Sequence, residues 1–210
     1  MSCNKHTDNL LVEHRGLLTA SDRLNQLNHR AITIWLTGLS ASGKSTLAYT
    51  VEYALHNLNI KTYVLDGDNV RHRVNKDLGF SAEDRSENIR RVAEIANLMN
   101  DAGLVVICAF ICPNANDRLK AKEIIGPDRF FEVYVSTSIE ICETRDPKLL
   151  YKKARSGELK NFTGVSAPYE IPKSPDICID TGVLSLESSV NNLLSVAMPK
   201  IIVHSKCEEV

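Results

Sequence analysis

The chain has 210 residues, of which 24% are charged and 43% hydrophobic, and its formal net charge is −1 at pH 7. This length suits one domain with a sizeable core. The near-neutral charge excludes a polycation that binds nucleic acid or an anionic membrane through its overall charge, so any anion site must be local. The sequence contains no run of 18 apolar residues, so we expect no membrane-spanning segment.

The six cysteines form no C-x-x-C pair, and no Cys/His cluster has zinc spacing. Several of them lie in apolar runs, where a free thiol packs as a small hydrophobic group. The N-terminal segment MSCNKHTDNLLVEHRG has no apolar signal-peptide core and is not rich in arginine. We therefore expect a cytoplasmic protein in a reducing compartment, without structural disulfides.

Residues 1–30 are polar, and we expect them to form a loose arm with one short helix that contains Leu24 and Leu27. Residues 31–210 are expected to form a single domain, in which apolar β-type runs alternate with helical periodicity. The expected strands are residues 32–37, 62–65, 104–110, 130–135 and 177–179.

Helical spacing fills the gaps between these strands, at residues 47–58, 89–99 and 186–197. Two capping boxes, Ser81 with Asp84 and Thr137 with Glu140, predict where helices begin. Strands that alternate with helices predict right-handed crossovers and an α/β fold. We expect a parallel sheet of about five strands, covered by helices on both faces.

The segment 146–175 differs from the rest of the chain. It is basic at first and then rich in Gly, Pro and Ser, and it has no strong apolar period. In an α/β nucleotide enzyme this is where a mobile lid would lie. We therefore predict a lid over about residues 146–175.

The stretch GLSASGKS, residues 38–45, matches the phosphate-loop motif G-x-x-x-x-G-K-[ST]. A β-type run precedes it and an amphipathic helix follows it, which is the context that the motif needs. Backbone N–H groups and a helix N-terminus would surround the phosphates. Lys44 would reach the β/γ oxygens, and Ser45 would bind Mg²⁺. The expected ATP-binding residues of the loop are Gly38, Ser40, Ala41, Ser42, Gly43, Lys44, Ser45 and Thr46.

The phosphate loop alone leaves the phosphate acceptor open. A GTPase is disfavoured because the guanine-reading N-K-x-D is absent: NKDL at 75–78 has its aspartate one position early, and no D-x-x-G follows the second strand. A motor or translocating ATPase would need a longer chain. A small-molecule kinase is therefore the favoured class.

Asp66 and Asp68 follow a predicted strand, and ligands of an open parallel sheet bind beyond the carboxyl ends of its strands. One acid near Mg²⁺ and near the attacking hydroxyl is what phosphoryl transfer requires. The alternative is that one of the two only caps the following helix.

Five arginines crowd the next segment and predict a local pocket for phosphate or sulfate. The alternative is a solvated helix face whose arginines pair with neighbouring glutamates. Arg85 and Asn88 lie one helical turn apart and share a face, and Phe80 could stack on a base. The five are Arg71, Arg73, Arg85, Arg90 and Arg91.

Seven phrases then appear in order: GLSASGKST, LDGDNVR, DLGFS-x-x-DR-x-ENIRR, AFICP, CETRDPK, YKKAR-x-GELKNFTG and PYE-x-P. On these phrases, residues 30–180 resemble the adenylyl-sulfate kinase (APS kinase) family of sulfate assimilation. The resemblance implies a P-loop kinase fold and a homodimer that uses ATP with Mg²⁺. It also implies transfer of the γ-phosphate to the 3′-hydroxyl of adenosine 5′-phosphosulfate (APS), which gives PAPS and ADP. It leaves open a functional coupling to ATP sulfurylase.

The resemblance also implies roles for single residues. Asp68 would be the acid at the 3′-hydroxyl and near Mg²⁺. Phe80 and Phe162 would stack on the two faces of the APS adenine, and Cys142 and Arg145 would meet the ATP adenine. The lid would cover 146–166. The other residues implied for the APS pocket are Arg71, Arg85, Asn88, Ile111, Cys112 and Lys148.

Two other functions are alternatives to this one. A kinase for a nucleoside, nucleotide or sugar is disfavoured by the ordered phrases. A weakly catalytic regulatory subunit is disfavoured because Lys44 and Asp68 are both present.

The sequence departs from the family pattern at three places. Cys112 stands where serine is usual, Arg73 and Val74 stand where Gly-Leu is usual, and Leu149 stands where glycine is usual. A glycine is often needed for a positive φ or a close backbone approach. If either need exists here, Arg73 or Leu149 would strain the pocket or the lid; at ordinary helical positions the changes would be harmless.

Some bacterial members of the family become phosphorylated on the serine that Cys112 replaces. We predict direct transfer without a phosphoenzyme, because a thiol does not accept phosphate in the same way as a hydroxyl. Incubation with γ-labelled radioactive ATP should leave the protein unlabelled on a denaturing gel. A labelled band that disappears in Cys112→Ala would contradict this prediction.

Overall fold

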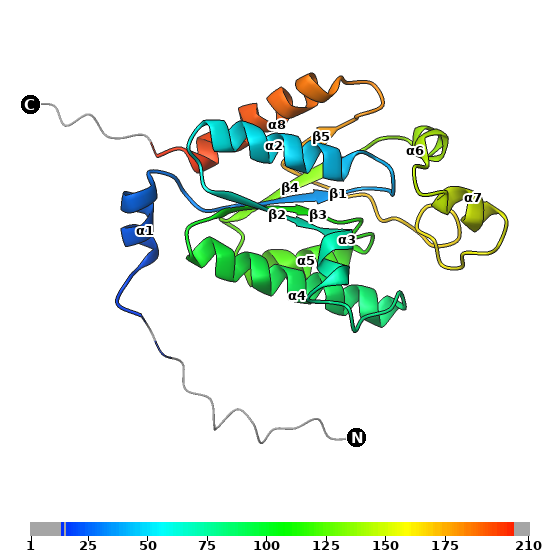
Figure 1. The fold of residues 1–210 in the computed structure, drawn as a ribbon, viewed down its shortest axis with the longest axis horizontal. Coiled ribbons are helices and arrows are strands. Elements are labelled where there is room, and N and C mark those ends of the chain that lie inside the picture. The colour runs from blue at the N-terminus through cyan, green and yellow to red at the C-terminus, as the bar shows by residue number, and fades with distance from the viewer. Residues whose placement is uncertain (1–13, 15, 204–210) are drawn as a thin grey trace, which may run out of the picture.

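The computed structural model describes residues 14 and 16–203, and a five-stranded sheet lies at its centre (Figure 1). All neighbouring strands are parallel, in the order β2-β3-β1-β4-β5. The expected α/β fold is confirmed, and each strand begins and ends within one residue of its expected range. The strands are β1 (Thr33–Thr37), β2 (Thr62–Asp66), β3 (Val105–Ala109), β4 (Phe130–Val135) and β5 (Ile177–Ile179).

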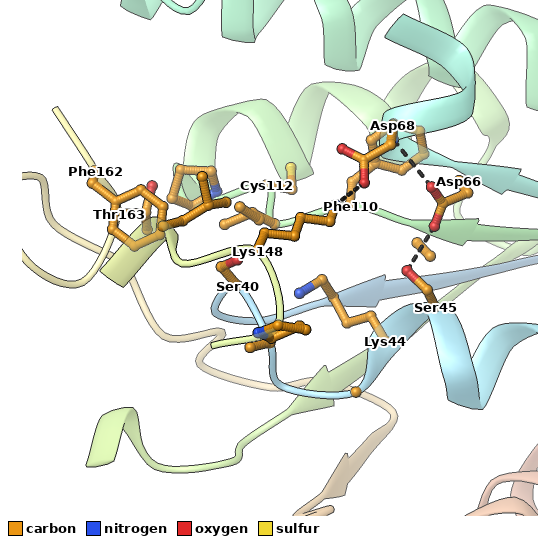
Figure 2. Close-up of a pocket in the computed structure, with 18 of the residues that line it drawn as sticks. Ser40, Lys44, Ser45, Asp66, Asp68, Phe110, Cys112, Lys148, Phe162 and Thr163 are labelled. Carbon is orange, nitrogen blue, oxygen red and sulfur yellow. Dashed lines mark hydrogen bonds and ion pairs between the residues drawn. The ribbon is translucent and has the colours of Figure 1, made fainter. Parts of the chain in front are cut away.

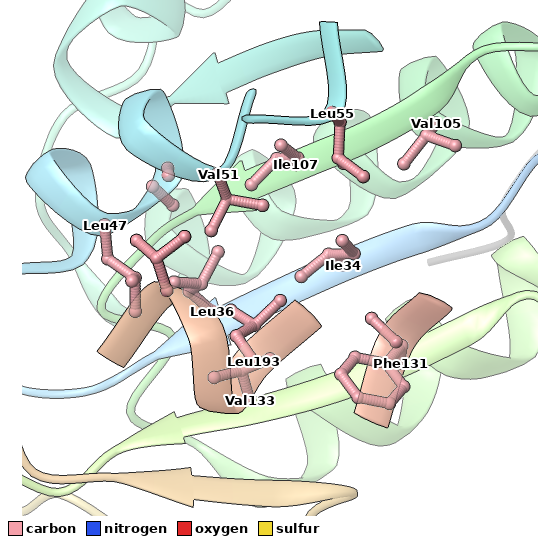
Figure 3. Packing of buried hydrophobic residues seen from close by; sticks show 14 of the residues in the cluster. Ile34, Leu36, Leu47, Val51, Leu55, Val105, Ile107, Phe131, Val133 and Leu193 are labelled. Atoms are coloured by element: carbon pink, nitrogen blue, oxygen red, sulfur yellow. The ribbon is translucent and has the colours of Figure 1, made fainter. Parts of the chain in front are cut away.

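Helices cover both faces of the sheet, and β1 is buried on both sides. Ile34 and Leu36 pack with α2 (Lys44–Asn57) and α8 (Leu186–Ile201) on one face (Figure 3). Trp35 points to the opposite face and packs with residues of α4 (Ala82–Asp101) and α5 (Ala115–Ile125). Because successive side chains of a strand alternate, one five-residue strand anchors two cores.

One of the two predicted capping boxes is at the wrong residue. Ser81 does begin α4, since its side chain accepts a hydrogen bond from the backbone N–H of Asp84. The cap of α6 (Ile139–Arg145) is Ser138, not Thr137. Thr137 is buried and donates its hydroxyl to the Ser42 carbonyl, because it lies at the end of β4 beside the phosphate loop.

Four short helices complete the described part of the chain: α1 (Ala20–Leu27), α3 (Gly67–His72), α6 and α7 (Leu150–Arg155). The expected N-terminal helix is confirmed as α1, which begins with a capping box of Thr19 and Asp22. Sequence periodicity did not locate α3, α5 or α7. Residues 1–13 of the expected arm lie outside the described residues. No helix in the described part is long and apolar enough to cross a membrane.

His29 joins the two ends of the domain. It is 3% exposed and forms an isolated antiparallel bridge with Ile202, next to a backbone hydrogen bond from Arg30 to Ile201. Its Nε2 accepts a hydrogen bond from the backbone N–H of Lys61, at 3.2 Å. The ring is therefore neutral at this nitrogen, and burial lowers the pKa of His29 below its usual 6.5.

We expect this ring to make the protein less stable below pH 6.5. As the pH falls through that value, the unfolded chain binds a proton that the folded chain does not, so stability present above it is lost. Urea midpoints measured at about pH 7.5 and at about pH 5.5 should fall more for the wild type than for His29→Gln. His56→Gln, at an exposed position, is the control and should behave as the wild type. An equal fall of the urea midpoint between the two pH values in the wild type and in His29→Gln would contradict the expectation.

Candidate active site

A cavity of about 1090 Å³ lies at the carboxyl ends of the strands. The phosphate loop borders it on one side, and the ends of β2 and β3, the start of α4 and the segment 145–163 border it on the others (Figure 2). Most of the residues predicted from sequence line this one cavity. They are Ser40, Ala41, Gly43, Lys44, Ser45, Thr46, Asp68, Arg71, Phe80, Arg85, Asn88, Ile111, Cys112, Arg145, Lys148 and Phe162.

Three predicted residues lie behind the lining rather than in it: Gly38, Ser42 and Cys142. A Cβ on Gly38 would come within 2.5 Å of the Val135 carbonyl oxygen, so only glycine allows the loop to leave β1 here. Cys142 is fully buried and packs with Tyr151 and Phe162. Burial raises the pKa of its thiol. This side chain supports the cavity wall from behind.

Lys44 is the best-enclosed cation of the cavity. It is 8% exposed, and its Nζ donates hydrogen bonds to the carbonyls of Gly38 and Leu39, at 3.0 and 2.5 Å, and to Ser42 Oγ, at 3.3 Å. Burial lowers its pKa to about 8. Only neutral oxygens hold this ammonium within the loop, so an anion that entered the loop would meet a poorly compensated positive charge.

Asp66 uses both of its carboxylate oxygens. Oδ1 accepts from the backbone N–H of Asp68 and so caps α3, while Oδ2 accepts from the hydroxyl of Ser45 at 2.7 Å. Asp66 is 7% exposed, so this pair is held at the floor of the cavity (Figure 2). Asp66 therefore caps α3 and also lines the cavity. A hydroxyl and a carboxylate side by side are ligands that Mg²⁺ accepts, so these residues fit a magnesium site.

Asp68 lies in the first turn of α3 and points into the cavity, where it forms an ion pair with Lys148 (Figure 2). Both side chains are more than half exposed. Lys148 lies between α6 and α7, so this pair joins the predicted lid to the acceptor side of the site.

The arginine cluster divides into two groups. Arg71 and Arg85 line the cavity, whereas Arg90 and Arg91 lie on the outer face of α4 and pair with acidic residues. Arg73 is exposed outside the lining. The pocket interpretation therefore holds for two arginines, and the helix-face interpretation holds for Arg90 and Arg91. Their acidic partners are Asp77, Glu87 and Glu94.

Arg85 connects α4 to the predicted lid. Its guanidinium donates to the Phe80 carbonyl, to the Asn161 carbonyl at 2.7 Å and to Thr163 Oγ1 at 3.1 Å. Arg71 donates to the Gly79 carbonyl, and its guanidinium lies 4.5 Å from the centre of the Phe80 ring. Desolvation by burial lowers the pKa of both arginines. Both are thus held partly desolvated at the cavity.

Three further residues shape the acceptor side. Phe80 is 69% exposed, while Phe162 is buried and meets Tyr151 edge-on, with ring centres 5.0 Å apart. Asn88 is buried, and its Oδ1 accepts from Asn75 Nδ2 at 2.9 Å. Phe80 thus presents an exposed ring at the cavity, and Phe162 belongs to the wall.

Two residues that support the phosphate loop were missed from the sequence. Thr137 and Thr181 follow β4 and β5, and the Thr181 hydroxyl donates to the Ser42 carbonyl at 2.8 Å. Arg145 donates to Thr181 Oγ1 and to the Thr181 carbonyl, at 2.8 and 2.6 Å. The signal available in the sequence was a threonine shortly after the carboxyl end of β4 and another after that of β5.

The predicted lid packs against the phosphate loop. It contains α7, whose Tyr151 donates its hydroxyl to the Ser40 carbonyl at 3.0 Å. A small apolar cluster fixes this contact; its buried members are Cys142, Tyr151, Ala154 and Phe162, and Leu39 and Ala41 of the loop pack against them.

The structure decides between the two interpretations of the unusual residues. Leu149, the N-cap of α7, has φ 56° and ψ 26°, which is the left-handed region that favours glycine. Arg73 has φ −120°, so no positive φ strains it. Of the two residues that stand at glycine positions of the family, Leu149 has a left-handed backbone and Arg73 does not.

Comparison with known proteins agrees with this geometry. Residues 30–180 match the family model described as adenylylsulphate kinase. The chain is 52% identical to an adenylyl-sulfate kinase of Bacteroides fragilis, over 90% of this chain and 93% of that protein. It is also 52% identical to the adenylyl-sulfate kinase of Enterobacter sp., over 96% and 99% of the two chains.

Solved structures give the same result. The APS kinase of Mycobacterium tuberculosis, in complex with AMPPNP and APS, is 44% identical with a TM-score of 0.77, and the match covers 80% of this chain and 98% of that chain. A hexameric APS kinase from Thiobacillus denitrificans is 26% identical with a TM-score of 0.64, over 86% of this chain and 32% of that chain. A sugar kinase from Janibacter sp. is 19% identical with a TM-score of 0.57, over 83% and 99%, and shares the fold only.

We expect Leu149→Gly to be more stable than Leu149→Ala, by about 1 kcal/mol, because alanine keeps the steric cost of the left-handed backbone. Urea unfolding of the two variants measures the difference. The same pair at Lys152, an exposed position within α7, is the matched control. There the order should reverse by about 1 kcal/mol, since glycine is the poorer helix former. The same order at both positions would contradict the assigned strain.

Proposed function

The chain belongs to the adenylyl-sulfate kinase family, and from this premise we propose which residues hold its two nucleotides and its metal ion. The reaction is the ATP-dependent transfer of a phosphoryl group to the 3′-hydroxyl of APS, which yields PAPS and ADP. The observation that best supports the assignment is that one cavity is lined both by the phosphate loop and by Asp68, Arg71 and Arg85. Donor and acceptor can therefore meet without leaving the protein.

On the donor side, the phosphate loop and Lys44 would bind the triphosphate of ATP, and Arg145 would approach its adenine. Ser45 and Asp66 would hold Mg²⁺, with Asp68 nearby. When bound, Mg²⁺ neutralises charge on the phosphate oxygens and orients them. Lys44 suits this role because its ammonium is buried among neutral carbonyls, where a developing negative charge is strongly stabilised.

On the acceptor side, Arg71, Arg85 and Asn88 would bind the phosphosulfate and ribose of APS. Guanidinium groups suit both phosphate and sulfate oxygens, since they donate in a planar fork. Phe80 would stack on the adenine, with Phe162 in the opposite wall. The remaining contacts of this half would come from Ile111, Cys112 and Lys148.

Asp68 would accept a hydrogen bond from the 3′-hydroxyl and take its proton as the new bond forms. The transition state of phosphoryl transfer is loose, so orientation by one carboxylate suffices. The ion pair between Asp68 and Lys148 must open first. The released ammonium of Lys148 would then face the anionic substrate. The 3′-hydroxyl of APS would take the place of Lys148 beside Asp68.

We further propose that the protein acts as a cytoplasmic homodimer and that its APS is supplied by an ATP sulfurylase. The hexameric relative supports assembly of several copies. Light scattering of the purified chain measures the assembly state, and a mass of one chain would reject the homodimer.

The function is tested by chromatographic measurement of PAPS from APS, ATP and Mg²⁺. Nucleosides, nucleotides and sugars serve as alternative acceptors, and Lys44→Ala reports background kinase activity. We expect PAPS with the wild type and a loss of about a hundredfold or more in Lys44→Ala. Phosphorylation of another acceptor but not of APS would reject the proposed function.

The roles of the two aspartates are separated by matched asparagine variants. Asp68→Asn should lower kcat by about a hundredfold with little change in the KM for ATP, because the acid is lost and the donor site is intact. Asp66→Asn still caps α3, since asparagine is an equally good N-cap. It should instead raise the Mg²⁺ concentration needed for half-maximal rate, because an amide is a weaker ligand. Near wild-type kcat in Asp68→Asn would show that the acid is assigned wrongly.

A further inference from the structure

The loop that follows β3 has a strained backbone at the wall of the cavity. Cys112 has φ 41°, a left-handed value that is unusual for a residue other than glycine. Its side chain is 2% exposed, and burial raises the pKa of its thiol. Such a conformation costs about 1–3 kcal/mol and persists only where neighbouring groups hold it. Ile111, Cys112 and Pro113 all line the cavity, so whatever holds this loop also shapes the acceptor side.

Two side chains hold the loop by its carbonyl groups. Thr37, at the end of β1, donates its hydroxyl to the Ile111 carbonyl at 2.7 Å. Arg118, on α5, donates from Nη1 to the Cys112 carbonyl at 2.8 Å. The Thr37 hydroxyl also lies 3.2 Å from the Cys112 carbonyl oxygen, so Thr37 and Arg118 together fix the direction in which the loop leaves the cavity wall.

Arg118 also binds the far end of the predicted lid. Its Nη2 donates to the Glu170 carbonyl at 2.6 Å, and its Nε lies 3.1 Å from Glu132 Oε1. The side chain is 6% exposed, so its three contacts form a closed set around one guanidinium. A planar fork is needed to reach two carbonyls and a carboxylate in different directions.

The lid end is attached to the same loop by its backbone. The Glu170 N–H donates to the Pro113 carbonyl at 2.9 Å, and its carboxylate accepts from the Ala115 N–H at 2.7 Å. The Tyr169 hydroxyl lies 2.9 Å from Thr37 Oγ1. The loop 111–113 is therefore held between α5 and residues 169–170 of the predicted lid. Arg118 is the charged residue that contacts both this loop and the lid.

We propose that Arg118 is a positioning residue for the acceptor nucleotide. It does not contact the substrate; it keeps the strained wall at Ile111 and Cys112, and the lid end at Glu170, in the arrangement that binds APS. Arg118 contacts none of the donor residues Lys44, Ser45 and Asp66, which are held by their own hydrogen bonds. This inference rests on the proposed function, in which Ile111 and Cys112 belong to the APS half of the cavity.

A different role must be separated from this one. Arg118 and Glu132 form a buried ion pair, and removal of one partner would leave the other charge buried and destabilise the whole protein. Two variants avoid this. Arg118→Lys keeps the charge but loses the fork. The double variant Arg118→Met with Glu132→Gln removes both charges, and such replacements are often neutral for stability.

The experiment measures kcat, the KM for APS, the KM for ATP and the melting temperature of both variants. Arg129→Lys is the control; Arg129 forms a more exposed ion pair with Asp101 and does not line the cavity. We expect the KM for APS to rise about tenfold or more in both variants, since small displacements of a positioning group have large effects. The KM for ATP should stay within about twofold, and the control should match the wild type.

Each other outcome counts against the proposal. Equal rises in both KM values, or unchanged KM values with a lower melting temperature, would make Arg118 a structural residue only. Failure of Arg118→Lys to fold, beside a folded control, would lead to the same conclusion. Calorimetric binding of APS and of AMPPNP to the wild type keeps the two proposals distinct. If the wild type does not bind APS, the proposed function fails, and the variants do not bear on that result.

Discussion

The hydrogen bond from Ser45 to Asp66 ties the phosphate loop to the carboxyl end of β2 at the cavity. Ser45 begins α2 after β1, and Asp66 ends β2, yet β3 lies between these two strands in the sheet. After β1 the chain therefore forms β2 two positions away in the sheet, and β3 fills the position between them. The carboxyl ends of β1 and β2 border a crevice above the end of β3. Ligands of open α/β sheets bind at such a crevice. The loop after β3, with Ile111 and Cys112, forms its wall for the same topological reason.

The sequence predicted most of this from patterns that are local. Strand alternation, helix periodicity and the phosphate-loop motif depend on neighbours in the chain, and the strands appear within one residue of their expected ranges. Side-chain roles that depend on residues distant in the chain were left open or missed. Asp66 has one oxygen on a helix cap and the other on Ser45, which no local pattern can show. The arginines of the segment after β2 also look alike in sequence, but only packing decides which of them face the cavity.

Arg118 shows the same limit more strongly. Its sequence context is a polar stretch with acidic and basic neighbours, where an arginine is normally solvated. Its partners lie at Cys112, Glu132 and Glu170, and the last is 52 positions along the chain. Leu149 is a contrasting case. The sequence marked it as unusual through a family resemblance, and the backbone gave the physical reason in the form of a left-handed φ. A departure from pattern can therefore be seen in sequence before its cost is known.

Three of the contacts that attach the segment 146–175 to the site lie near its start, in its middle and near its end. Near its start, Lys148 pairs with Asp68 on the acceptor side. In its middle, Tyr151 bonds to Ser40 of the phosphate loop. Near its end, the Glu170 carbonyl is held by Arg118. An exposed ion pair contributes little, about 0–1 kcal/mol, whereas a buried charged donor contributes more, about 1.5–3 kcal/mol. The ion pair at Lys148 is therefore the weakest of these three contacts.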